Sequence, residues 1–155
     1  MAALRSSSRV MMDFCDSMSS AISTMLTAPW TIFCRAAITA PAGRWIVGRG
    51  WHQSKWTAPP EGAVEGYPRH DDLSRVTPRN PVYLTHASGH LVFANADAMR
   101  LAKITRTTPD PPGGQVLRDE HGKPIGILRE NAFSLVANVM RTAGDQTGTP
   151  EGEAA

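Results

Sequence analysis

The sequence predicts an α+β fold built from two β-hairpins and short helices. Three observations favour this class. Two pairs of apolar segments each flank a turn that contains Gly, a strong helix cap follows the first pair, and a helical apolar pattern follows the second. A chain of 155 residues fits one domain. Its 13 Gly and 12 Pro follow no repeat, which excludes collagen-like and low-complexity classes.

The first 35 residues are expected to form a separate segment, disordered or loosely helical. Apolar residues at positions 10–26 recur at spacings of three and four, the period of a helix. Seven Ser residues at positions 6–23 oppose a stable helix, because Ser favours caps and turns. Cys15 and Cys34 are interpreted as small apolar side chains, since two cysteines make neither a disulfide framework nor a four-cysteine zinc site.

Residues 36–144 are expected to form the folded segment. Residues 45–47, Trp-Ile-Val, indicate a short buried strand. The sequence Gly48-Arg49-Gly50 that follows predicts a bend where the backbone must come close to another group. Residues 57–68, rich in Pro and Gly, indicate a loop.

A short helix is predicted over residues 73–76, capped by Asp71 or Asp72 and ending before Pro78. The first hairpin comes next. Residues 82–86 and 90–94 read as strands, joined by a three-residue loop that contains Gly.

Asn95 is a good N-cap for a helix over residues 96–102. Lys103 then occupies the position just after the helix, where a left-handed backbone is common and costs a residue other than Gly about 1 kcal/mol. Residues 115–117 and 125–128 predict a second hairpin that turns near Gly122.

A last helix is predicted from about Glu130 to Thr142, where an acidic first residue suits the helix dipole. Its apolar face is formed by Phe133, Val136, Val139 and Met140. Gly144 stands where a C-terminal cap would lie. Residues 145–155 are expected to be a disordered tail.

Charge and hydropathy exclude several function classes. Charged residues make up 19% of the chain and the net charge is +2, so no basic surface for nucleic acid is expected. The longest uncharged stretch, residues 17–34, contains Pro29 and too few apolar residues for a membrane span. No compact signal peptide follows Arg5 and Arg9, so a cytoplasmic protein is expected.

Four motifs resemble, in their order, amidohydrolase family 3, in the branch that includes N-substituted formamide deformylases. The resemblance covers about residues 36–140. The motifs are Trp45-Ile-Val-Gly-Arg-Gly-Trp51, Pro81-Val-Tyr-Leu-Thr-His-Ala-Ser-Gly-His90, Thr108-Pro-Asp-Pro-Pro-Gly-Gly114 and Gly122-Lys-Pro-Ile-Gly-Ile-Leu-Arg-Glu130.

The resemblance implies a metal-dependent hydrolase that acts on carbon–nitrogen, amide-type bonds of small molecules. It also implies a catalytic (β/α)₈ barrel and a divalent, zinc-like metal, and it is compatible with a homo-oligomer. The family's His-x-His metal motif should precede Trp45 and is absent there. The other metal ligands would follow Glu130. The resemblance therefore predicts an internal fragment of such an enzyme, with no catalytic or metal-binding residue of its own and inactive alone. The alternative is a non-catalytic α+β binding or interaction module.

Trp51, His86 and His90 are the candidate substrate-binding residues. His86 and His90 flank Ser88-Gly89, so they lie at a turn rather than on one helix face. Two interpretations stay open for them. They could hydrogen-bond a substrate at an active-site mouth, or they could satisfy backbone groups within the turn. Trp51 is either an aromatic substrate wall or part of the core, whereas Trp45 is expected in the core.

Overall fold

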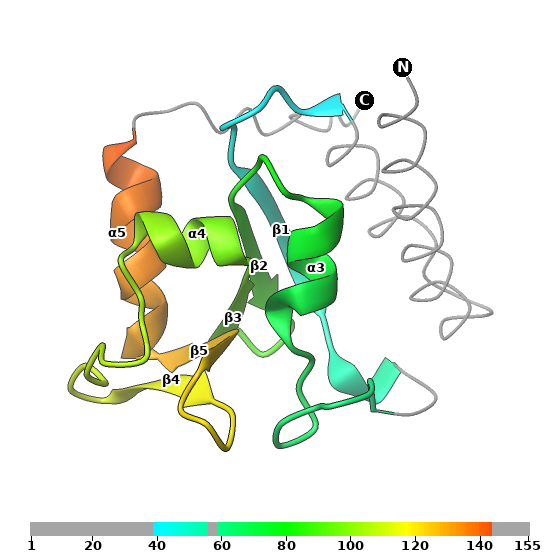
Figure 1. Ribbon diagram of the computed structural model, residues 1–155, viewed down its shortest axis with the longest axis vertical. Coiled ribbons are helices and arrows are strands. Elements are labelled where there is room, and N and C mark those ends of the chain that lie inside the picture. The colour runs from blue at the N-terminus through cyan, green and yellow to red at the C-terminus, as the bar shows by residue number, and fades with distance from the viewer. Residues whose placement is uncertain (1–38, 56–58, 144–155) are drawn as a thin grey trace.

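A computed structural model describes residues 39–55 and 59–143, which form one mixed sheet with short helices packed around it (Figure 1). Five strands lie in the order β1-β2-β3-β5-β4. The predicted helix at 10–26, both cysteines, Trp56, Gly144 and residues 145–155 lie outside the described residues. The bounds are β1 Ile46–Trp51, β2 Val82–His86, β3 Leu91–Ala94, β4 Gly114–Arg118 and β5 Pro124–Glu130.

Both predicted hairpins are confirmed. β2 pairs antiparallel with β3, and β4 pairs antiparallel with β5. Gly89 and Gly122 sit in the two turns with φ of +78° and +77°, the left-handed region that glycine adopts at little cost. The hairpins join through β3 and β5, which also run antiparallel, so they form one continuous sheet rather than two separate ribbons.

The prediction of a bend at Gly48-Arg49-Gly50 is wrong. These residues continue β1, which pairs parallel with β2. The close approach expected of the glycines is present, because a Cβ on Gly48 would lie 2.8 Å from the Leu84 side chain on β2. The register shifts between Arg49 and Trp51, and Gly50 in that step has φ of +91°.

Helix α3 (His70–Val76) lies in the connection between β1 and β2. It starts three residues before the predicted position. The predicted Asp cap is also wrong, because Arg69 is the N-cap and Asp71 and Asp72 lie inside the first turn. There the two carboxylates still suit the positive end of the helix dipole.

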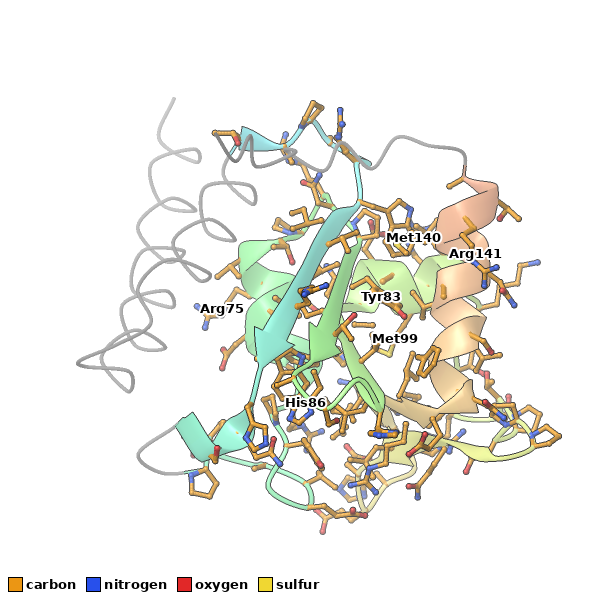
Figure 2. The ribbon with its side chains drawn as sticks, turned by 180° about the vertical axis from the view of Figure 1, so that it is seen from behind. Arg75, Tyr83, His86, Met99, Met140 and Arg141 are labelled. Carbon is orange, nitrogen blue, oxygen red and sulfur yellow. The ribbon has the colours of Figure 1, made fainter. Side chains whose placement is uncertain are left out.

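Apolar side chains cover both faces of the sheet. On one face, Leu73 of α3 packs with Leu84 and Phe93. On the other face lie α4 (Ala96–Leu101) and α5 (Ser134–Thr142). Their side chains Met99 and Val136 are part of the apolar cluster that covers this face. Figure 1 shows α3 and α5 on opposite sides of the sheet, with α4 between them. Figure 2 places Tyr83 and Met99 on the side where α5 lies.

Asn95 joins three elements through hydrogen bonds and is fully buried. Its Oδ1 accepts from the backbone N–H of Ala98, which is the predicted N-cap of α4, and from the N–H of Val82 at the start of β2. Its Nδ2 donates to the carbonyl oxygens of Thr77 and Asn80, just after α3. The predicted cap is thus confirmed, and it also fixes where α3 and β2 sit.

Helix α4 is followed by its C-cap Ala102 and then by Lys103, which has a φ of +54°, the left-handed conformation considered for it from the sequence. The N–H of Ile104 donates to the carbonyl of Met99 at 2.9 Å, and the N–H of Lys103 donates to the carbonyl of Arg100 at 3.1 Å. This pair of bonds is the Schellman arrangement, in which the residue after the cap adopts the left-handed conformation.

Glu130 does not start a helix. It is the last residue of β5 and has φ of +48°. A 3-10 helix, Asn131–Phe133, follows, and α5 begins only at Ser134. The predicted apolar face is confirmed: Val136 is fully buried, and Phe133, Val139 and Met140 pack against the same cluster.

We expect Asn95→Ala to lower the free energy of unfolding by about 3 kcal/mol, because it removes a helix cap and leaves several buried backbone groups without a partner. Asn95→Asp keeps the cap acceptor but loses both donors, so it should destabilise as well. Urea unfolding measures both changes. The control is Asn138→Ala on the exposed face of α5, expected to change stability by less than about 0.5 kcal/mol. A wild-type-like Asn95→Ala would contradict this role.

Lys103→Gly should raise the free energy of unfolding by about 1 kcal/mol, because glycine adopts the left-handed conformation without the steric cost borne by lysine. The control is Arg100→Gly inside α4, which should lower it by about 1 kcal/mol. Thermal melts of the two variants compare them directly. A lower melting temperature for Lys103→Gly would show that this cap assignment is wrong.

Candidate substrate-binding edge

Polar side chains gather at one edge of the sheet, where β1, β2 and β5 end. β1 is parallel to β2, and both β2 and β5 are antiparallel to β3, so these three strands run the same way. Ligands commonly bind beyond the carboxyl ends of neighbouring parallel strands. We call this set the histidine edge; its members are His52, Gln53, His86, His90 and Glu130.

His86 ends β2 and is 5% exposed (Figure 2). The backbone N–H of Ser88 donates to its Nδ1 at 3.1 Å, and the Ser88 hydroxyl lies 2.8 Å from the same nitrogen. Because a backbone N–H can only donate, Nδ1 must be an acceptor and the neutral ring holds its proton on Nε2. That Nε2–H donates to Oε1 of Gln53 at 2.8 Å.

His52 follows β1 and makes the same kind of turn. The backbone N–H of Ser54 donates to its Nδ1 at 3.0 Å, and the Ser54 hydroxyl lies 2.7 Å away. The rings of His52 and His86 are 4.6 Å apart between centroids. Neither His52 nor Gln53 is among the site residues predicted from the sequence. The spacing His-x-Ser, found at residues 52–54 and again at 86–88, is the signal that could have pointed to them.

Trp51 is 4% exposed and packs in the core. This matches the core interpretation of Trp51 and differs from the alternative, in which its ring would line a substrate site. Its indole N–H donates to the carbonyl of Leu84 at 2.9 Å. The ring meets His86 edge-on, with centroids 4.7 Å apart. Trp51 therefore supports His86 from the core side. Trp45 is buried on the opposite face of the sheet, as predicted.

His90 is exposed and lies beside Glu130. Its Nδ1 is 3.3 Å from Oε2 of Glu130, and the N–H of Glu130 donates to the carbonyl of His90 at 2.8 Å. The left-handed φ of Glu130 is costly for a residue with a Cβ, and such strain clusters at functional sites. The two histidines lie on the two sides of the turn, as predicted. The structure adds that His86 is buried and His90 is exposed.

The histidine edge does not fit a metal site. Within residues 39–55 and 59–143, no three His, Cys, Asp or Glu side chains are grouped so that they could hold an ion. Nδ1 of both His52 and His86 already accepts from a serine N–H. His70 lies buried on α3 beside Ser74, and His121 lies on an exposed turn. In the same part of the chain, no helix has the length and apolar character needed to cross a membrane.

Burial lowers the pKa of His86 below its ordinary value of 6.5, and the nearby His52 lowers it further. Burial also lowers the pKa of His70, although the Asp71 carboxylate acts in the opposite direction. Both imidazoles are therefore neutral at pH 7, in agreement with the acceptor role of Nδ1 in His86.

Comparison with known proteins agrees with the motifs. The model of the amidohydrolase family matches residues 10–153. The chain belongs to the amidohydrolase family. The match starts well before residue 36, so the family similarity extends further at both ends than the motifs did. It includes residues 10–35 of the N-terminal segment that was expected to be separate.

Three curated relatives match similar shares of the chain. N-substituted formamide deformylase of Arthrobacter pascens is 38% identical over 62% of this chain and 17% of its own length. Putative amidohydrolase YtcJ of Bacillus subtilis is 34% identical over 64% of this chain and 18% of its own length. Protein LONG AFTER FAR-RED 3 of Arabidopsis thaliana is 34% identical over 67% of this chain and 17% of its own length. The chain thus spans about a sixth of the length of these relatives.

A crystal structure of an uncharacterized metal-dependent hydrolase from Pyrococcus furiosus is similar with a TM-score of 0.47 and 20% identity. The alignment covers 87% of this chain and 23% of that one. A likeness of this size bears on neither fold nor function.

The free energy of unfolding is expected to fall as the pH drops below 6.5. Because the folded-state pKa values of His86 and His70 are lowered, the folded chain binds these protons less readily than the unfolded chain. Their contribution to stability is complete above the unfolded pKa of about 6.5. It is lost as the pH falls through the lowered folded values.

Urea unfolding across this pH range measures the effect. His86→Gln removes one of the two groups and should flatten the dependence, and the double variant with His70→Asn should flatten it further. An unchanged slope in the double variant would contradict the assignment.

Proposed function

We propose that this chain is part of a hydrolase that acts on carbon–nitrogen, amide-type bonds of small molecules, and that the substrate binds at the histidine edge. Membership of the amidohydrolase family supports the reaction class. The observation that supports the location is the convergence of three histidines, a glutamine and a strained glutamate where three strands end. The 38% identical relative, named for N-substituted formamides, suggests the substrate class.

In this proposal, N–H donors of the edge bind the carbonyl oxygen of the substrate. Donors aimed at an oxygen that gains negative charge stabilise the transition state of acyl transfer. His90 is the most accessible of them, and Glu130 holds its ring through Nδ1. The wider proposal places the histidine edge at the mouth of a (β/α)₈ barrel, where loops at the strand ends build the site.

The resemblance also implies a divalent metal, which the described residues do not fit, so no step is assigned to it. A cytoplasmic location and a homo-oligomer belong to the same proposal. Cell fractionation and sedimentation of the full chain test these two points.

We expect the purified full chain to bind no stoichiometric metal. The physical reason is that a zinc site needs at least three protein ligands, and the described residues bring no such set together. Elemental analysis after dialysis, with and without added Zn²⁺, measures this. One tightly bound metal ion per chain would show that ligands outside the described residues complete a centre within this chain.

A chimera tests the reaction class. The matched segment of the Arthrobacter pascens deformylase is replaced by that of this chain, and hydrolysis of formanilide, an N-substituted formamide, is measured. We expect hydrolysis, and we expect His90→Ala to lower kcat/KM about tenfold or more through loss of a donor to the substrate oxygen.

The matched control is His121→Ala, on an exposed turn between β4 and β5, which should leave kcat/KM unchanged. A folded chimera without activity, beside an active parent enzyme, would refute the proposed function.

A further inference from the structure

The side-chain amide of Gln53 is held in one orientation. Its Oε1 accepts from Nε2–H of His86, and the tautomer of His86 is fixed by the Ser88 N–H on the opposite side of the ring. If the amide flipped, two N–H donors would face each other. The carbonyl of Gln53 therefore points at His86, and its NH₂ group faces away from that ring.

Within residues 39–55 and 59–143, the NH₂ group of Gln53 donates to no acceptor, and the residue is only half-buried. Gln53 sits in the 3-10 helix Gln53–Lys55, directly beyond the end of β1. Its two N–H donors are complementary to a carbonyl oxygen, the group that amide-type compounds present.

We propose that the amide NH₂ of Gln53 binds the carbonyl oxygen of the substrate, and that His86 is the positioning residue that orients this amide. This inference rests on the proposed function and deepens it by naming the contacting group.

His86 suits positioning better than direct contact. Both ring nitrogens are occupied, Nδ1 by Ser88 and Nε2 by Gln53. The ring is 5% exposed, and Trp51 packs against it edge-on from the core. Such a group acts on a ligand through the neighbour that it holds.

Binding is tested on the full chain, with formanilide as the probe. In ¹⁵N-labelled protein, the side-chain NH₂ signals of Gln53 should shift in a saturable way as formanilide is added. Gln53→Glu keeps the acceptor toward His86 but replaces the NH₂ group with an oxygen, so affinity should fall about tenfold or more. The matched control is Gln115→Glu on β4, with β2, β3 and β5 between it and β1, which should leave affinity unchanged.

The role of His86 is tested by two substitutions that differ in which ring nitrogen they imitate. A glutamine amide can reach the place of Nε2 and donate to Gln53, whereas an asparagine amide reaches only the place of Nδ1. His86→Gln should therefore keep formanilide binding, and His86→Asn should weaken it to the level of Gln53→Glu. Long-range ¹H–¹⁵N spectra of the wild type should show the proton of His86 on Nε2. Far-UV circular dichroism checks that each variant is folded.

The outcomes separate the two proposals. Saturable binding centred on Gln53 and lost in Gln53→Glu supports the inference. Saturable binding at His90 with unchanged Gln53 signals and an unaffected Gln53→Glu overturns the inference and leaves the proposed function standing. A proton on Nδ1 of His86, or equal binding by His86→Gln and His86→Asn, overturns the positioning role. No saturable shift anywhere on the histidine edge overturns both proposals.

Discussion

The buried amide of Asn95 is the constraint on which the arrangement of this domain depends. Its oxygen takes the N–H groups that begin α4 and β2, and its nitrogen donates to the chain that leaves α3. A buried backbone group without a partner is costly, so these elements can meet in few other ways. The position of β2 in turn places β1, and with it His52 and Gln53, beside His86.

The local parts of this fold can be predicted from the sequence. Alternating apolar residues around Gly89 and Gly122 define the hairpins, and Asn95 and Lys103 mark the two ends of α4. The path of β1 could not be predicted, because Gly48 and Gly50 resemble a bend and only the distant Leu84 explains them. The predicted helix start at Glu130 is wrong because an acidic residue before an apolar helical pattern resembles the first residue of a helix, and only the pairing of β5 shows that Glu130 belongs to a strand.

The candidate site shows the same limit. His86 and His90 stand out because they flank one turn, yet their different environments depend on the strands around them. The link from His86 to Gln53 spans 33 positions of sequence and exists only because β1 and β2 pair in parallel. No local pattern contains such a contact. Trp51 likewise reads as core or as substrate wall until the sheet places it behind His86.

The parallel pairing of β1 also has a kinetic consequence. Hairpins close over a few residues, whereas β1 reaches β2 only across a connection of about thirty residues, and contacts so distant in sequence form slowly. β1 is also the outermost strand of the described sheet, with β2 as its neighbour there. The hairpins and α4 can therefore assemble first, with His86 and His90 already in place. His52 and Gln53 arrive when β1 docks, so the histidine edge is completed by one of the last steps of folding and opens with one of the first steps of unfolding.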